Sequence, residues 1–273
     1  MNATLQRRLQ RYNWDQAAAR YEPSWQHQLA PAHRALLARA AARPAERVLD
    51  IACGTGLVTF AAAAAVGPMG PVMGVDLSGE MVTLARARAR ERGRYHVHFE
   101  RMDAEDLTLP DGLFDLTLCA LGLMYVPDAA KAVSEMARML APGGRAVAAV
   151  WGARSRCGWA EVFPIVDARM KSEMCPLFFA LGTGDRLASL FRGAGLTDVV
   201  TETVGARLDW RSADEACGAA FVGGPVALAH SRFDGATRMA AYREYLESID
   251  TWRIGAGYAV PGEFVVVSGR KVA

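Results

Sequence analysis

The segment that most constrains the fold is the run V-L-D-I-A-C-G-T-G at residues 48–56. Its apolar start predicts a short buried strand. Gly54 and Gly56 then make a sterically permissive turn, and the Ala-rich run 57–66 predicts a helix. A strand, a glycine turn and a helix N-terminus together form a cradle for the polar part of a nucleotide-like ligand.

Asp50 stands at the end of the predicted strand. A carboxylate at this point repels a pyrophosphate but suits a cationic ligand. The third glycine of a dinucleotide-binding G-x-G-x-x-G motif is missing, because L-V-T follows Gly56. No G-x-x-x-x-G-K-S/T motif is present either. The turn therefore indicates neither an ATP site nor an NAD site.

Strand and helix patterns alternate five times between about residues 45 and 150. Such alternation predicts a doubly wound α/β fold, with helices on both faces of a parallel sheet. Two later strands extend the prediction to a mostly parallel, seven-stranded sheet. The expected strands are 48–51, 72–75, 97–102, 114–120, 145–150, 197–204 and 264–267.

The N-terminal segment, residues 1–44, is predicted to be helical. Its pattern gives one helix over 15–21 and an amphipathic one over 28–42, which ends before Pro44. We expect this segment to contribute to a lid over a ligand. The alternative is that its aromatic side chains only pack on the domain surface.

The rest of the chain, residues 45–273, is taken as one ligand-binding α/β domain. The alternation fails over about 152–182 and about 209–252. We expect these two stretches to be insertions, with helices that build a cap over the strand ends.

Asp50, Asp76 and Asp103 close the first three predicted strands. Ligands of parallel sheets bind at these carboxyl ends. Asp76 follows Gly56 by 76 − 56 = 20 positions, the separation at which an acid reaches ribose hydroxyls, and Asp103 is placed to accept from an adenine amino group. Each aspartate alone could be a helix cap or a turn residue, but acids at three successive strand ends indicate a nucleoside site.

Taken together, these segments resemble the class I S-adenosylmethionine-dependent methyltransferases. The resemblance is strongest to the ubiquinone/menaquinone-biosynthesis-like group, which acts on small molecules. It covers about residues 45–150, implies a Rossmann-like fold, and is specific for the cofactor but not for the acceptor. The matching segments are V-L-D-I-A-C-G-T-G, G-V-D-L-S (74–78), M-D-A-E-D-L (102–107), F-D-L-T-L-C-A-L-G-L-M-Y-V (114–126), L-A-P-G-G (140–144) and, near the N-terminus, W-D-Q-A-A-A-R-Y-E (14–22).

The resemblance implies that S-adenosyl-L-methionine is the cofactor and S-adenosyl-L-homocysteine its product. Asp50, Gly54 and Gly56 would hold the methionine part, with the Ala52 carbonyl near its ammonium group. The positive charges of the ammonium and sulfonium groups explain why a carboxylate is tolerated at Asp50.

The nucleoside part would lie against the next two loops. The resemblance implies that Asp76 binds the ribose hydroxyls and that Leu77 packs on the adenine. Asp103 and Ala104 would bind the adenine edge.

The sulfonium end would be lined by Ala120 and Leu121, with Tyr21 closing over it. The reaction implied is in-line displacement at the methyl carbon. Holding the reacting atoms in line supplies on the order of several kcal/mol, and a general base matters only if the acceptor must lose a proton.

The residues that act on the acceptor are less well marked. His27 and His230 fall in the expected lid and cap, so they are the candidate catalytic bases. Tyr125, Trp151 and Tyr258 are candidates for the substrate pocket, although aromatic core residues look the same in sequence. No cluster of His and Cys has the spacing of a metal site, so no metal is expected.

Composition limits the partners. The net charge is only +2, and no block of five Lys or Arg residues occurs, which argues against a nucleic-acid-binding face. Five cysteines without a C-x-x-C pair favour a reducing compartment. No signal-peptide core is present, and the apolar run 116–126 is too short to span a bilayer. We expect a cytoplasmic protein with a small-molecule acceptor and no membrane span, and a homodimer stays open.

The function expected is methyl transfer to an O, N, C or S atom of a small, partly apolar metabolite. A nucleic-acid methyltransferase is the first alternative, but the N/D-P-P-Y/F loop is absent and Cys175-Pro176 reverses the order of a Pro-Cys nucleophile motif. A protein methyltransferase and a non-catalytic S-adenosylmethionine-binding module also stay open. An NAD-dependent oxidoreductase is disfavoured by the missing third glycine and by Asp50.

Overall fold

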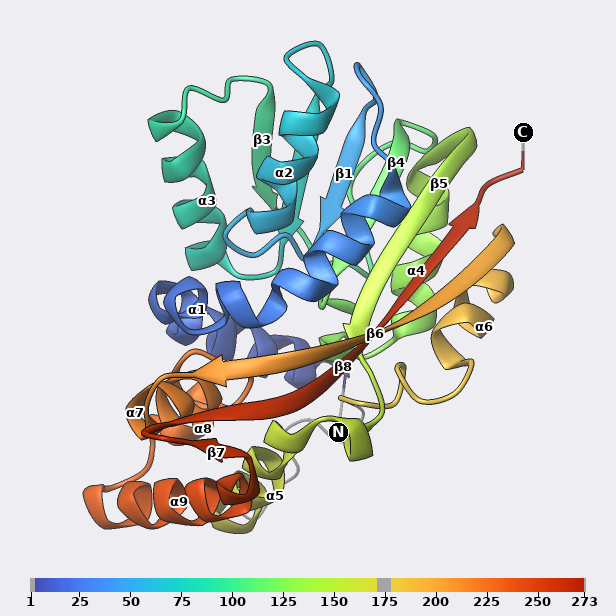
Figure 1. The fold of residues 1–273 in the computed structure, drawn as a ribbon. Helices are drawn as coiled ribbons and strands as arrows, with labels where there is room; N and C mark the ends of the chain where they lie inside the picture. The colour runs from blue at the N-terminus through green and yellow to red at the C-terminus, as the bar shows by residue number, and fades with distance from the viewer. Residues whose placement is uncertain (1–2, 171–177, 273) are drawn as a thin grey trace.

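The computed structural model describes residues 3–170 and 178–272. One eight-stranded sheet has the order β3-β2-β1-β4-β5-β8-β6, and β7 pairs with β8 off this path (Figure 1). The strands are β1 (Val48–Ile51), β2 (Val72–Asp76), β3 (Val97–Arg101), β4 (Phe114–Ala120), β5 (Leu140–Trp151), β6 (Thr197–Trp210), β7 (Arg253–Ile254) and β8 (Gly257–Arg270).

Strands β1 to β5 pair in parallel, whereas β8 pairs antiparallel with both β5 and β6. The predicted doubly wound, mostly parallel sheet is confirmed, with one addition, the two-residue β7. The expected strands 197–204 and 264–267 are both too short, because β6 and β8 continue as a long two-stranded ribbon. Pro261 and Gly262 interrupt the apolar pattern inside β8 and conceal its first half from a sequence-based prediction.

Helices cover both faces of the sheet (Figure 1). The apolar residues of α2, α3 and the end of α1 form one core cluster with β1 and its neighbours, and α4 and α6 pack in the other cluster with the cap. The main helices are α1 (Ala3–Ala40), α2 (Leu57–Val66), α3 (Gly79–Glu91), α4 (Ala129–Met139), α5 (Val162–Met170), α6 (Arg186–Gly193), α7 (Ala213–Cys217), α8 (Ala227–His230) and α9 (Gly235–Ser248).

Helix α1 is one continuous helix of 38 residues. The prediction of two separate helices is wrong. Helix α1 continues through Pro23 and Pro31, residues that usually interrupt a helix. Each proline removes one backbone N–H, but packing of the flanking turns holds the helix together. Figure 1 shows α1 passing between the carboxyl ends of the parallel strands and the helices below them.

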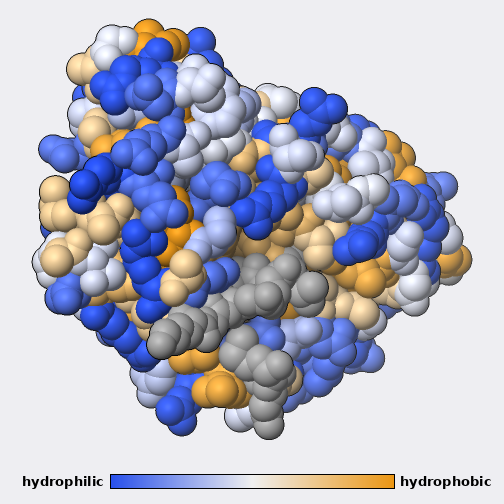
Figure 2. Space-filling view, turned by 90° about the horizontal axis from the view of Figure 1, so that it is seen from below, coloured by the Kyte–Doolittle hydropathy of each residue, from blue (hydrophilic) through white to orange (hydrophobic). Residues whose placement is uncertain are grey.

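The cap helices, α5, α7, α8 and α9, lie beyond the carboxyl ends of the parallel strands (Figure 1). Strand β6 runs to Trp210, so the helical part of the second expected insertion begins only at Ala213. Residues 171–177 of the first expected insertion lie outside the described residues. Seen from below, this side of the molecule shows hydrophilic residues around smaller groups of hydrophobic ones (Figure 2).

None of the helices in the described part of the chain combines the length and the apolar character needed to cross a bilayer.

Candidate functional site

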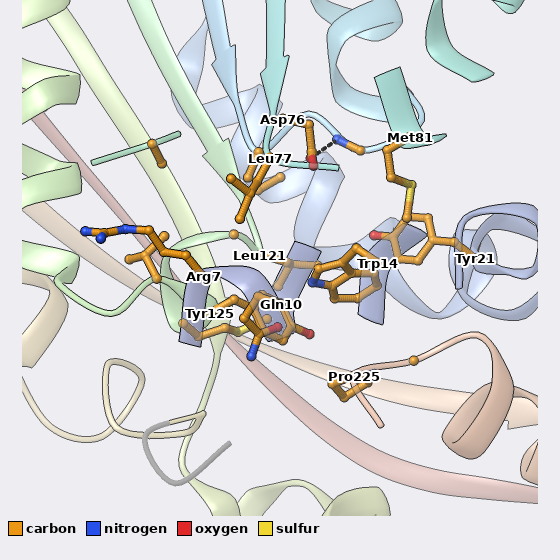
Figure 3. Close-up of a pocket in the computed structure, with 18 of the residues that line it drawn as sticks. Arg7, Gln10, Trp14, Tyr21, Asp76, Leu77, Met81, Leu121, Tyr125 and Pro225 are labelled. Carbon is orange, nitrogen blue, oxygen red and sulfur yellow. Dashed lines mark hydrogen bonds between the residues drawn. The ribbon is translucent and has the colours of Figure 1, made fainter. Parts of the chain in front are cut away.

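A cavity of about 110 Å³ lies where the carboxyl ends of the parallel strands meet α1. Figure 3 shows Asp76 and Leu77 on the side of the sheet, and Trp14 and Gln10 of α1 facing them. Pro225 from the cap lies on the far side (Figure 3). The cavity is therefore bounded by three parts of the chain that are distant in sequence.

Asp76, the last residue of β2, is held by two backbone donors. The Gly54 N–H donates to its Oδ2 atom at 2.8 Å (Figure 3), and the Ser78 N–H donates to its Oδ1 atom at 2.8 Å. Burial raises the pKa of this carboxyl group, although the two backbone donors oppose the rise. A carboxylate oxygen accepts more than one hydrogen bond, so Asp76 can also accept from hydroxyl groups in the cavity.

Asp50 lies behind Gly54, in a small side cavity of about 20 Å³. The Thr59 hydroxyl donates to its Oδ2 atom at 2.6 Å, and its Oδ1 atom has no hydrogen-bond partner among the described residues. Burial raises the pKa of Asp50 to about 7, and burial lowers the pKa of His33, in the same cavity, to about 4. A buried carboxylate with one open oxygen is suited to a cationic group.

Asp103, after β3, stands beside an apolar slot formed by Leu77, Met102 and Ala104. The Glu105 N–H donates to its Oδ1 atom at 2.9 Å. This arrangement combines apolar side chains with a hydrogen-bond acceptor in the same part of the cavity lining. It fits a heteroaromatic ring that carries an amino group.

The loops after β1 and β4 approach each other closely. A Cβ atom at Gly122 would lie 2.3 Å from the Cβ of Ala52, so only glycine fits there. Ala52 and Leu121 both have left-handed backbone conformations, with φ of 57° and 61°, which costs on the order of 1–3 kcal/mol for each residue. This strain is concentrated where both loops line the cavity.

The other half of the cavity is aromatic. The rings of Trp14 and Tyr125 meet edge to face at 5.0 Å between centroids, and Trp159 lies 5.3 Å from Trp25 and 4.9 Å from Trp151. These five residues line the cavity. This half therefore favours apolar, ring-bearing molecules.

Most of the residues expected at the cofactor line this cavity. They are Tyr21, Ala52, Gly54, Asp76, Leu77, Asp103, Ala104, Ala120 and Leu121. Asp50 lines the side cavity instead.

Gly56 lines neither cavity. It has a φ of 91°, and a Cβ atom there would lie 2.8 Å from the ring of Phe60 and 3.1 Å from that of Phe99. Gly56 therefore serves the turn and the packing behind it, and its expected contact with the ligand stays a prediction.

Only some of the residues expected at the acceptor site line the cavity. Tyr125 and Trp151 line the cavity, but Tyr258 does not; it is buried in β8, where the Arg253 guanidinium donates to its hydroxyl at 3.0 Å. The two histidines are also elsewhere. His27 is exposed at a surface pocket on the outer side of α1, and His230 is buried inside the cap, 3.1 Å from the Tyr242 hydroxyl. The structure places neither histidine at the cavity.

Sequence reasoning missed several residues of the cavity wall. They are Arg7, Gln10, Trp14, Trp25 and Trp159. Trp14 opens the W-D-Q-A-A-A-R-Y-E segment, so a signal for it was present. The described residues contain no group of three or more His, Cys, Asp or Glu side chains arranged to hold a metal ion.

A family profile described as a methyltransferase domain matches residues 48–144. A demethylmenaquinone methyltransferase of Geobacillus sp. is 30% identical over 172 residues, which cover 56% of this chain and 72% of the relative. An aklanonic acid methyltransferase of Streptomyces sp. is 36% identical over 132 residues, which cover 48% of this chain and 60% of the relative. Most other curated relatives are matched over about half of their length.

The fold also has close structural neighbours. The YcgJ protein of Bacillus subtilis superposes with a TM-score of 0.61 at 22% identity, over 91% of this chain and 99% of that chain. Because the match covers 91% of this chain, the shared fold extends well beyond the 48–144 segment.

Proposed function

The chain belongs to the family of S-adenosylmethionine-dependent methyltransferases, and from this we propose that it transfers the methyl group of S-adenosylmethionine to a small, partly apolar acceptor. The observation that carries the proposal is Asp76. Its carboxylate lines the cavity at the end of β2 while two backbone donors hold it in place. This is the arrangement needed to accept two neighbouring ribose hydroxyls.

The residues present fit the cofactor at three points. The open Oδ1 atom of buried Asp50 suits an ammonium group. Gly54 leaves room for the methionine part, because a Cβ atom there would meet only Tyr21, at 3.9 Å. The slot beside Asp103 suits the adenine ring.

When bound, S-adenosylmethionine supplies an activated methyl group on a cationic sulfur. The chain then has to hold the acceptor atom in line with the methyl carbon and keep water away. The rigid, strained loop at Leu121 and the rings of Trp14, Tyr21 and Tyr125 border the place where this transfer would occur. Burial raises the pKa of Tyr21, so its hydroxyl stays neutral.

The aromatic half of the cavity supports an acceptor with an apolar ring system. Relatives named for demethylmenaquinone and aklanonic acid are consistent with this. The proposal includes action in the cytoplasm on free small molecules, without nucleic acid, and by a monomer or a homodimer. Salt-dependent binding of an oligonucleotide would contradict the expected absence of a nucleic-acid partner. Analytical sedimentation distinguishes a monomer from a homodimer.

Calorimetric titration with S-adenosylmethionine, S-adenosylhomocysteine and NAD tests the cofactor. Micromolar binding of the first two and no binding of NAD are expected. Binding of NAD alone would overturn the proposal. Mass spectrometry then detects methylation of a panel of ring-bearing acceptors. If the protein binds the cofactor but methylates no compound of the panel, a non-catalytic binding module is favoured.

Replacing Asp76 by Ala should weaken S-adenosylhomocysteine binding by roughly 2–4 kcal/mol, because charge-assisted hydrogen bonds to the ribose are lost. Asp115→Ala is the matched control. Asp115 is the second residue of β4, at the amino end of the strand, where it pairs with Arg47 at 2.7 Å. Equal affinities for the two variants would show that Asp76 does not hold the ribose.

A further inference from the structure

Helix α1 is tied to all three cofactor loops by polar contacts. The Glu22 carboxylate accepts from the Thr55 hydroxyl at 2.7 Å, and the Asp15 carboxylate accepts from the Ser78 hydroxyl at 2.6 Å. Arg7 makes the third contact, to the loop after β3. Only this last contact reaches a carboxylate that is itself expected to touch the cofactor.

The guanidinium of Arg7 is placed between two carboxylates. Its Nε atom lies 3.0 Å from Asp103 Oδ2 and 2.6 Å from Glu105 Oε2. Glu105 is fully buried, and its other oxygen accepts from the Asp128 N–H at 2.7 Å. These contacts raise the pKa of Arg7, which therefore stays charged.

The position of Asp103 depends on this arrangement. Its Oδ2 atom is held by Arg7 and its Oδ1 atom by the Glu105 N–H, at 2.9 Å. Without the guanidinium, Asp103 would face the buried Glu105 carboxylate with no intervening positive charge. Like charges repel strongly where little water is present, so Asp103 would turn away.

We propose that Arg7 is a positioning residue for adenine recognition, which acts by fixing the Asp103 carboxylate against the amino group of the base. This rests on the proposed function, because it requires the nucleoside to lie in the slot beside Asp103. Arg7 lies outside the 48–144 segment that matches the family profile. Part of the cofactor specificity of this chain therefore comes from its N-terminal helix.

The test compares S-adenosylhomocysteine with S-inosylhomocysteine, in which a carbonyl oxygen replaces the adenine amino group. A fixed carboxylate accepts from the amino group and repels the carbonyl oxygen. The intact protein should therefore prefer S-adenosylhomocysteine by about tenfold or more, as expected for a charge-assisted hydrogen bond. Calorimetry measures both affinities without any acceptor.

In Arg7→Met the preference should fall to within about threefold, given the size of that bond. In Asp103→Asn it should also be lost, and adding Arg7→Met to that variant should change it no further, because both residues act on one contact. A variant Arg7→Met that weakens both ligands by the same factor would show a merely structural role and overturn the proposal.

Two controls separate positioning from stability. Arg7→Met with Glu105→Gln removes the buried unpaired charge, so the fold should recover while the preference stays low. Arg39→Met breaks another ion pair of α1, to Glu202 at 2.8 Å, far from the slot, and should leave the preference unchanged. If the intact protein binds neither ligand, the proposed function fails. If it binds both equally, only the role of Arg7 and Asp103 fails.

Discussion

At the scale of single residues, Asp50 has the most strongly perturbed environment of the predicted acids. Burial raises its pKa to about 7 from the ordinary 3.8, against the opposing hydrogen bond from Thr59. A folded-state pKa above the unfolded value means that the neutral form is favoured in the folded protein. Its stabilising contribution is complete below pH 3.8 and is lost as the pH rises through about 7.

Cofactor binding should have the opposite pH dependence. A cationic cofactor favours the charged form of Asp50, so binding releases a proton and tightens by up to about tenfold from pH 6 to pH 8. In Asp50→Asn this pH dependence should be absent. Titrations in buffers with different ionisation heats measure the released proton. If the cofactor affinity of the variant keeps the same pH dependence, the proton released on binding comes from another group.

The sequence was sufficient to predict that Asp50, Asp76 and Asp103 lie at or near the carboxyl ends of β1, β2 and β3, because these positions depend on local patterns. Each follows a short apolar run, and parallel pairing brings the ends of such runs together. Arg7 could not be predicted, because its partner Glu105 is 98 positions away. The sequence alone does not tell which role Gly56 has, because a glycine needed for a positive φ looks the same as one needed for ligand access.

At the scale of elements, α1 links the sheet to the cap. Trp25 is 4% exposed, and its indole N–H donates to the Ala219 carbonyl at 3.1 Å. Its ring also contacts those of Trp151 and Trp210.

Trp25→Ala should destabilise the protein by about 3–5 kcal/mol, through loss of a large buried ring and the cavity that remains. Chemical denaturation measures the free energy of unfolding. Tyr95→Ala is the control, because Tyr95 is 84% exposed and its loss should change stability by less than about 0.5 kcal/mol. Similar values for the two variants would mean that α1 does not contribute to the core at Trp25.

At the scale of the whole molecule, the two halves of α1 are held differently. The first half reaches the three cofactor loops through Arg7, Asp15 and Glu22, whereas the second half is buried through residues such as Leu29 and Leu36. Weak polar contacts open more readily than a packed apolar face. We therefore expect that cofactor exchange requires only the first half to move.

Hydrogen exchange should reflect this difference. Saturating S-adenosylhomocysteine should slow exchange in residues 3–22 and in the loops after β1, β2 and β3. Exchange in residues 28–40 should stay the same, because that part is already protected by packing. If only the loops become protected from exchange, the prediction that α1 contributes to a lid is wrong.

The position of β8 has a consequence for synthesis of the chain. This strand is synthesised after the other seven strands of the sheet, yet it lies between β5 and β6 and pairs with both. Until it emerges, β5 presents an open edge and the 14-residue β6 has no place in the sheet. Nascent chains with such edges associate readily with one another. The sheet is completed by an interior strand, so we expect the edge of β5 to be most open to association before residues 257–270 emerge.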